Sequence, residues 1–113
     1  DGKLYAVGGF NHGQISSSVE RYDPATNAWE EVAPMAEVRC AHATAVLDGK
    51  LYAIGGFDDG SLSSVERYDP ALDAWEEVAP MSTARDEFAV AVLDGKLYAV
   101  GGDSRVGSLS SVE

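Results

Sequence analysis

Few side chains in this 113-residue chain could do chemistry on a substrate, and they follow no catalytic or metal-binding pattern. His12 and His42 are the two histidines, and Cys40 is the single cysteine. One cysteine cannot form an internal disulfide or build a structural zinc site by itself, and beside an apolar run it behaves as a small core residue. Asp58–Gly60 resembles the start of a calcium loop, but the alternating ligands and the closing glutamate are missing. We therefore expect no enzymatic activity, no metal and no cofactor.

The elements that carry these residues repeat along the chain. The segment DGKLYAVGG begins at Asp1, returns with one Val-to-Ile change at Asp48 and returns unchanged at Asp94, at intervals of 47 and 46 residues. SSVERYDPATNAWEEVAPM (Ser17–Met35) returns as SSVERYDPALDAWEEVAPM (Ser63–Met81). A long period built from strand-like sequence is typical of repeat architectures, in which each unit needs its neighbours to cover its apolar face.

One repeat, taken from residue 39 to residue 81, predicts four short antiparallel strands. The loops between them are shorter than the dozen or more residues that connect parallel strands. Asp48-Gly49 predicts a tight hairpin, the double glycine is expected to end the second strand, and Asp69-Pro70 favours a type I turn. The first two strands are almost uncharged and rich in alanine, so we place them inside and the charged third and fourth strands outside. The expected strands are His42–Leu47, Lys50–Ile54, Ser64–Tyr68 and Ala74–Val78.

The composition excludes some classes of partner. Lys and Arg number 8 and Asp and Glu number 19, so the formal net charge is 8 − 19 = −11. Such an acidic chain is poorly suited to nucleic acid, because that binding depends on Lys and Arg contacts to phosphates. No apolar run approaches the ~18–20 residues of a membrane-spanning helix, so we expect no membrane partner.

These features together resemble the kelch-repeat β-propeller family. A double glycine follows a G-x-L-Y strand at Gly8, Gly55 and Gly101, and a tyrosine precedes a tryptophan by seven residues at Tyr22 and Tyr68. The resemblance covers the whole chain. It is strongest to the kelch domains of BTB–kelch ubiquitin-ligase adaptors, which share the SVERYDP and VAPM segments. It implies an all-β fold, a partial kelch β-propeller of about two and a half blades, each a four-stranded antiparallel meander.

The phase of the repeat divides the chain into three units. Residues 1–38 hold strands two to four of a blade, residues 39–81 a complete blade, and residues 82–113 strands one to three of another. Kelch propellers usually have five to seven blades, so the resemblance implies that further blades of the same or other chains complete the ring. A piece of a longer propeller and a designed or consensus-like chain both fit. With only two blade–blade interfaces, we expect the isolated monomer to be unstable.

The candidate binding residues lie where the repeats differ. Most differences fall in the hairpin after the double glycine and in the connection from a fourth strand to the next first strand. In a meander both segments open on the same end of the blade, which is also the end that kelch domains use for partners. Constant strands with variable loops are typical of binding proteins, although drift in unconstrained loops would look the same. The candidate partner-binding residues are Asn11, His12, Gln14, Ile15, Glu37, Arg39, Asp58, Asp59, Ser61, Arg85, Asp86, Glu87, Asp103, Ser104 and Arg105.

Two arginines and several acids set the expected character of this face. Arg39 and Arg85 match a position where related adaptors place arginines that contact the ligand, and a local salt bridge with Glu37 or Asp86 is the alternative. Acidic residues crowd the same rim, which favours a basic or mixed-charge protein segment over the acidic peptides that some relatives bind.

We therefore predict a protein-interaction module, the substrate-recognition propeller of a ubiquitin-ligase adaptor. A structural or designed scaffold without a ligand is the alternative. A fragment of a propeller enzyme fits least. The copper oxidases of the family need His, Tyr and a modified Cys around the metal, and neither His12 nor His42 has a counterpart in the other repeat.

Overall fold

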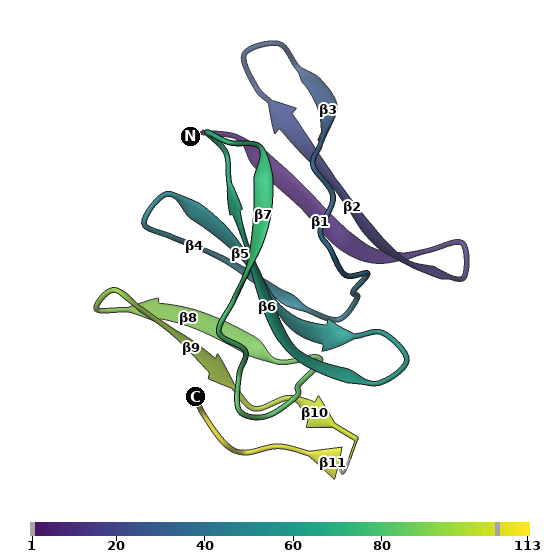
Figure 1. The fold of residues 1–113 in the computed structure, drawn as a ribbon, viewed down its shortest axis with the longest axis vertical. Coiled ribbons are helices and arrows are strands. Elements are labelled where there is room, and N and C mark those ends of the chain that lie inside the picture. Colours follow the sequence, from purple (N-terminus) through teal and green to yellow (C-terminus); the bar gives the residue numbers. More distant parts are fainter. Residues whose placement is uncertain (1, 106) are drawn as a thin grey trace.

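The computed structural model describes residues 2–105 and 107–113, and every regular element within them is a β-strand. The strands form three antiparallel units that fan out next to one another (Figure 1). Among the described residues no helix could cross a membrane. The all-β prediction is confirmed. The first unit has the order β1-β2-β3, with β1 at Leu4–Asn11, β2 at Gln14–Asp23 and β3 at Ala28–Val32.

The second unit is a complete blade whose four strands pair in chain order. Its strands match the four that the sequence predicts, although the middle two are longer than expected because both continue through the hairpin after the double glycine. The strands are β4 (Ala43–Leu47), β5 (Lys50–Phe57), β6 (Ser61–Asp69) and β7 (Ala74–Val78).

The third unit holds the first two strands of a blade and the beginning of the third. β8 (Ala89–Leu93) pairs with β9 (Lys96–Val100), and the short strands β10 (Asp103–Ser104) and β11 (Gly107–Ser108) form a small hairpin after them. The third strand is represented by a bridge between Val100 and Val112.

The double glycine does not end the second strand, as the sequence suggested, but forms a bulge within it. β5 runs through to Phe57, and its register with β6 shifts between Ile54 and Gly56. Gly55 has φ +58°, and a Cβ at this position would lie 2.8 Å from the carbonyl oxygen of Arg85. Glycine is therefore required because the connection to the next blade passes directly against the strand. In return Gly56 N–H donates to the Arg85 carbonyl over 2.8 Å.

The two predicted turns form as expected. Asp48 and Gly49 have φ of 52° and 75°, the two positive values that a type I′ hairpin requires. Leu72 N–H donates to the Asp69 carbonyl over 3.2 Å, which closes the turn that starts at Asp69-Pro70.

The core lies between the first and second units. Val19, Met35 and Ala53 are buried there, and Trp75 of β7 packs against them. The indole Nε1–H of Trp75 donates to the Ala33 carbonyl of the preceding unit over 2.8 Å. The large aromatic side chains of the repeat therefore join one blade to the next.

Candidate partner-binding site

Arg39 and Arg85 are structural residues, because both side chains are fully buried. The Arg39 guanidinium donates to the Gly55 and Ser64 carbonyls over 2.8 and 3.0 Å and to Glu66 Oε2 over 2.8 Å. Glu66 also accepts the backbone N–H of Ala36 over 2.7 Å. This arrangement ties the connection after one blade to the third strand of the next blade.

The same contacts recur one repeat later, at Arg85. Its guanidinium donates to the Gly101 and Ser111 carbonyls, each over 2.9 Å, and to Glu113 Oε2 over 3.0 Å. Burial alone would raise the pKa of Glu113. Hydrogen bonds from Ser82, Arg85 and Thr83 outweigh this and lower the pKa to about 2. We call each arginine with its glutamate an arginine latch.

The latches change the expected role of the two arginines. With no exposed side-chain surface, neither can touch a partner from solvent in this structure. The predicted alternative, a salt bridge between Arg39 and Glu37, is present but is not the closest ion pair. The Arg39 guanidinium lies 3.6 Å from Glu37 Oε1 and 2.8 Å from Glu66 Oε2 of the next blade. Glu66 does not vary between repeats and was therefore not among the predicted partner-binding residues; the structure places it in an ion pair between blades.

The hairpins and the connections meet at one end of the blades, which we call the loop face. A backbone bridge joins Cys40 of one connection to Phe57 of the next hairpin, and another joins Asp86 to Asp103. Figure 1 shows the β1–β2, β5–β6 and β10–β11 hairpins projecting toward the same side of the fan. The expected shared face is therefore present, and it is built from backbone hydrogen bonds between neighbouring blades.

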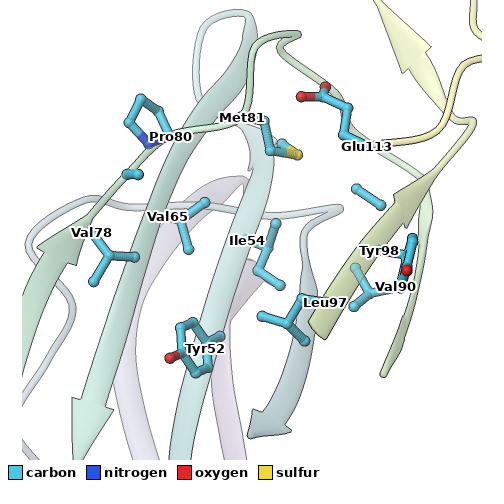
Figure 2. A pocket seen from close by; sticks show the side chains of 12 residues that line it. Tyr52, Ile54, Val65, Val78, Pro80, Met81, Val90, Leu97, Tyr98 and Glu113 are labelled. Atoms are coloured by element: carbon cyan, nitrogen blue, oxygen red, sulfur yellow. The ribbon is translucent and has the colours of Figure 1, made fainter. Parts of the chain in front are cut away.

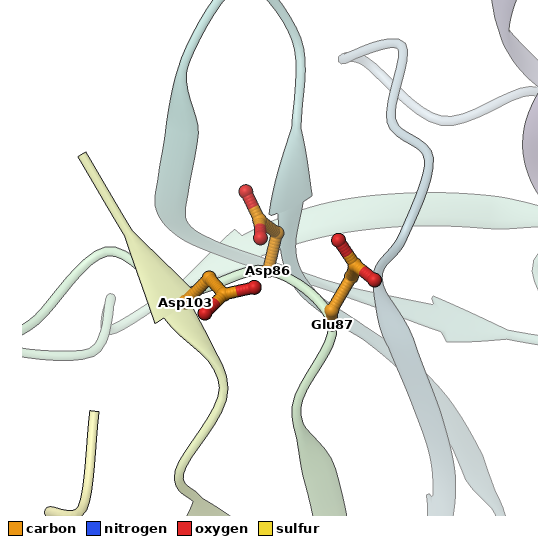
Figure 3. Close-up of side chains that lie close together, drawn as sticks. All are labelled: Asp86, Glu87 and Asp103. Carbon is orange, nitrogen blue, oxygen red and sulfur yellow. The ribbon is translucent and has the colours of Figure 1, made fainter. Parts of the chain in front are cut away.

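Three carboxylates come together on the loop face. One oxygen from each of Asp86, Glu87 and Asp103 lies within 4.8 Å of the others, and their side chains approach one another in Figure 3. Asp86 is nearly buried and accepts a hydrogen bond from Ser61 Oγ over 3.0 Å. Glu87 is exposed and has φ +49°, and its N–H donates to the Ala41 carbonyl of the preceding connection. We call Asp86, Glu87 and Asp103 the acidic group.

Two hollows flank the acidic group. One, of about 310 Å³, is lined by Cys40, Ala41, Phe57 and two members of the acidic group. The other, of about 340 Å³, is lined by residues 58–61 and Arg105. Both hollows are open to solvent. The first combines apolar and charged side chains, whereas the second is lined by charged and polar residues and a glycine. Charged and apolar walls side by side suit side chains of another protein.

Most of the predicted residues that remain exposed fall on or beside these hollows. Asp58, Asp59, Ser61 and Arg105 line the second hollow. His12, Gln14 and Ile15 lie on the separate β1–β2 hairpin, and no described hydrogen bond or ion pair links them to the acidic group. Glu37 lies at the first latch, where its Oε1 accepts Ser64 Oγ–H over 2.6 Å. Asn11 ends β1, and Ser104 lies in the small β10–β11 hairpin.

The predicted binding residues also leave out Phe57 and Ala41, which line the first hollow. Phe57 is 39% exposed and its counterpart Phe10 is 67% exposed, and the two are identical, so only Asp103 of the third repeat appeared as a difference at this position. Their signal was an aromatic residue directly after the first two double glycines, in a segment expected to face solvent.

Cys40 does not have the environment of a nucleophile. Burial raises the pKa of its thiol, and the nearby carboxylates of Asp86 and Asp58 raise it further. The thiol therefore stays protonated at neutral pH, as the sequence interpretation of Cys40 as a small packing residue requires.

Comparison with known proteins agrees with this geometry. One solved structure, titled "Structure of YjhT", superimposes with a TM-score of 0.80 at 21% identity, over 92% of this chain and 32% of that chain. The chain therefore spans about a third of the length of that structure and shares its fold. The sequence model of the Kelch motif matches residues 1–36, 39–82 and 84–113. The chain belongs to the Kelch motif family and has the fold of a partial kelch-type β-propeller.

Proposed function

We propose that the loop face binds a partner protein through a segment that carries lysine or arginine. Kelch repeats are generally protein-interaction propeller modules. The observation that supports a basic partner is the acidic group, in which three carboxylates lie within 4.8 Å beside two open hollows. A lysine or arginine of the partner at this point would relieve the repulsion between the carboxylates. The net charge of −11 would also speed the approach of such a partner at low salt.

A rigid frame supports this surface. The connections that carry Cys40 and Asp86 are held on one side by the buried latches and on the other by backbone bridges to the hairpins. Little conformational freedom is therefore lost from this backbone on binding, which favours affinity.

The experiment compares two double variants that change charge equally. Asp58→Lys with Glu87→Lys alters the loop face without touching the nearly buried Asp86. Glu31→Lys with Glu77→Lys alters exposed positions on the outer strands β3 and β7. Both change the formal net charge from −11 to −11 + 4 = −7. The probe is a random peptide display library of constant peptide length, selected against the unmodified protein.

We expect the selected peptides to be enriched in lysine and arginine. Their affinity should fall about tenfold or more for the loop-face variant, remain within a factor of about two for the outer-strand variant, and decrease with added salt. Equal binding by the two variants, or selected peptides without basic residues, would contradict the proposal.

We further propose that this surface recognises the substrate of a ubiquitin-ligase adaptor. The support is the resemblance of the SVERYDP and VAPM segments, at Ser18–Pro24, Ser64–Pro70 and the two VAPM positions, to the BTB–kelch adaptors. The reading frame that encodes this chain tests it: BTB and BACK sequences upstream are expected, and their absence from the complete frame would refute this part of the proposal alone.

A further inference from the structure

Three positions of the repeat change from apolar to acidic between neighbouring units on the loop face. Where the first two units meet, these positions hold an apolar group, which consists of Cys40, Ala41 and Phe57. One repeat later the same positions hold the acidic group. The same backbone bridge between connection and hairpin forms at both places. The two groups therefore present different side chains on the same backbone arrangement.

A mainly apolar hollow joins the two groups. It has a volume of about 310 Å³ and is lined by the whole apolar group together with Asp86 and Glu87. Its walls come from the connections before β4 and β8 and from the last residue of β5, Phe57, which is 39% exposed. The Glu87 N–H donates to the Ala41 carbonyl over 2.9 Å, so a backbone hydrogen bond holds the acidic wall beside the apolar wall.

The carboxylates at this hollow lack a cation. None of the ion pairs formed among residues 2–105 and 107–113 involves the acidic group. Asp86 and Asp103 each accept one serine hydroxyl, over 3.0 and 3.2 Å, whereas no described hydrogen bond reaches the exposed side chain of Glu87. Three carboxylates this close repel one another, so a positive charge placed beside them is stabilised.

The pocket between the second and third units does not offer this combination. It has a volume of about 290 Å³, and Glu113 is the one charged residue among the described residues that line it (Figure 2). The Glu113 carboxylate already accepts hydrogen bonds from Arg85 and Ser82. The hollow on the loop face is therefore better suited to a cation that carries an apolar stem.

We propose that this hollow binds an arginine side chain of the partner segment in preference to lysine. The inference rests on the proposed function and names the residue that the loop face recognises. The apolar stem of the arginine lies along the apolar group, and its guanidinium reaches Asp86 and Glu87.

The two kinds of wall favour arginine for separate reasons. A guanidinium is planar and weakly hydrated, so it stacks on an aromatic ring such as that of Phe57. It also donates two parallel hydrogen bonds to one carboxylate. The ammonium group of lysine is a compact, strongly hydrated charge that cannot form the parallel pair of hydrogen bonds.

Peptides selected from a display library against the unmodified protein test this preference. Arginine should be enriched over lysine relative to the unselected library. Replacing the arginine of a selected peptide by lysine should weaken binding about tenfold, because the stacking and the second hydrogen bond are lost. Citrulline, which has a similar shape but no charge, should weaken binding at least as much. These replacements leave the protein unchanged, so they do not depend on the folding of a variant.

Variants of the protein test the two walls separately. Phe57→Leu should weaken an arginine peptide about fivefold, the size of a cation–π contact, and its lysine version by no more than a factor of about two. Phe57→Tyr keeps the ring and should bind like the unmodified protein. Phe10→Leu is the matched control, because Phe10 holds the corresponding position in the first unit and lies outside the hollow. It should leave binding unchanged.

The acidic wall is tested by Glu87→Ala. This variant introduces the residue that the preceding repeat carries, Ala41, at a similar backbone angle, since φ is 49° at Glu87 and 52° at Ala41. It should weaken both the arginine peptide and its lysine version, because both depend on the charge.

The outcomes separate this inference from the proposed function. Selected peptides that are basic but contain lysine as often as arginine would overturn the inference and leave the proposed function standing. Equal effects of Phe57→Leu and Phe10→Leu on an arginine peptide would do the same. Selected peptides without basic residues would refute the proposed function itself, and this inference with it.

Discussion

His42 shows how one residue can make this fold sensitive to pH. Its imidazole lies at the first blade interface, and its Nδ1 is buried without a hydrogen-bond partner among the described residues. Burial lowers its pKa, and the nearby Arg39 guanidinium lowers it further, whereas a hydrogen bond to the backbone of Val7 acts in the opposite direction. The net effect keeps His42 neutral in the folded protein at pH 7.

The depressed pKa predicts a loss of stability in mild acid. As the pH falls below about 6.5, the unfolded chain takes up a proton at His42 before the folded chain does, so the free energy of unfolding decreases. His42→Phe introduces the residue that the next repeat carries at this position, Phe88, and should remove this part of the pH dependence. The measurement is denaturant unfolding at several pH values between 7.5 and 5. If the free energy of unfolding of the His42→Phe protein changes with pH as steeply as that of the unmodified protein, the prediction is wrong.

His12→Asn provides the control. It removes the other imidazole at an exposed turn position with φ +51°, a conformation that asparagine tolerates. The pH dependence of the free energy of unfolding that His42 causes should remain in the His12→Asn protein.

At the scale of the strand, the double glycine couples the shape of β5 to the path of the connection beside it. Gly55 and Gly49 both have positive φ, at 58° and 75°, so alanine is strained at either position. They differ in their surroundings. A Cβ at Gly55 would lie 2.8 Å from the Arg85 carbonyl oxygen and 2.9 Å from Met81 Cε, whereas a Cβ at Gly49 meets nothing within 4 Å.

Alanine substitutions at Gly49 and Gly55 therefore distinguish backbone strain from steric conflict. Gly49→Ala should cost about 1–2 kcal/mol of unfolding free energy, the cost of a left-handed conformation for alanine. Gly55→Ala should cost about 1–3 kcal/mol more, because the connection must move to admit the methyl group. Denaturant unfolding of the two variants measures the difference. Equal losses would show that the connection yields freely and that the close approach does not require glycine.

At the scale of the whole molecule, the arginine latches couple one blade to the next. Arg39 and Glu66 are both buried, at 0% and 3% side-chain exposure, and belong to successive repeats. Arg67 forms an ion pair with Glu76 within a single blade, and both side chains are partly or fully exposed. The chain therefore offers a buried pair between blades and a comparable surface pair within one.

Breaking the latch should be far more damaging than breaking the surface pair. Arg39→Ala leaves the buried Glu66 carboxylate without its cation and should cost about 3–5 kcal/mol of unfolding free energy. Arg67→Ala should cost about 0–1 kcal/mol, the usual range for an exposed pair. Thermal and denaturant unfolding give both values. If the two losses are similar, the latch is not what holds the blades together.

Local sequence patterns were sufficient to predict the strands and turns of this protein. Strand positions, the tight hairpin at Asp48-Gly49 and the shared end of the hairpins and connections follow from patterns within a few residues, because alternation and turn chemistry act locally. Because near-identical segments fold alike, the repeat period also predicted which strands belong to each blade.

Features that depend on contacts with a neighbouring repeat could not be predicted from these local patterns. The sequence placed Arg39 and Arg85 on the binding surface, but their guanidinium groups are buried because a glutamate 27 or 28 residues later in the chain folds back to meet each of them. Gly55 lies in a bulge, not at a strand end, because the connection from the second blade passes against it.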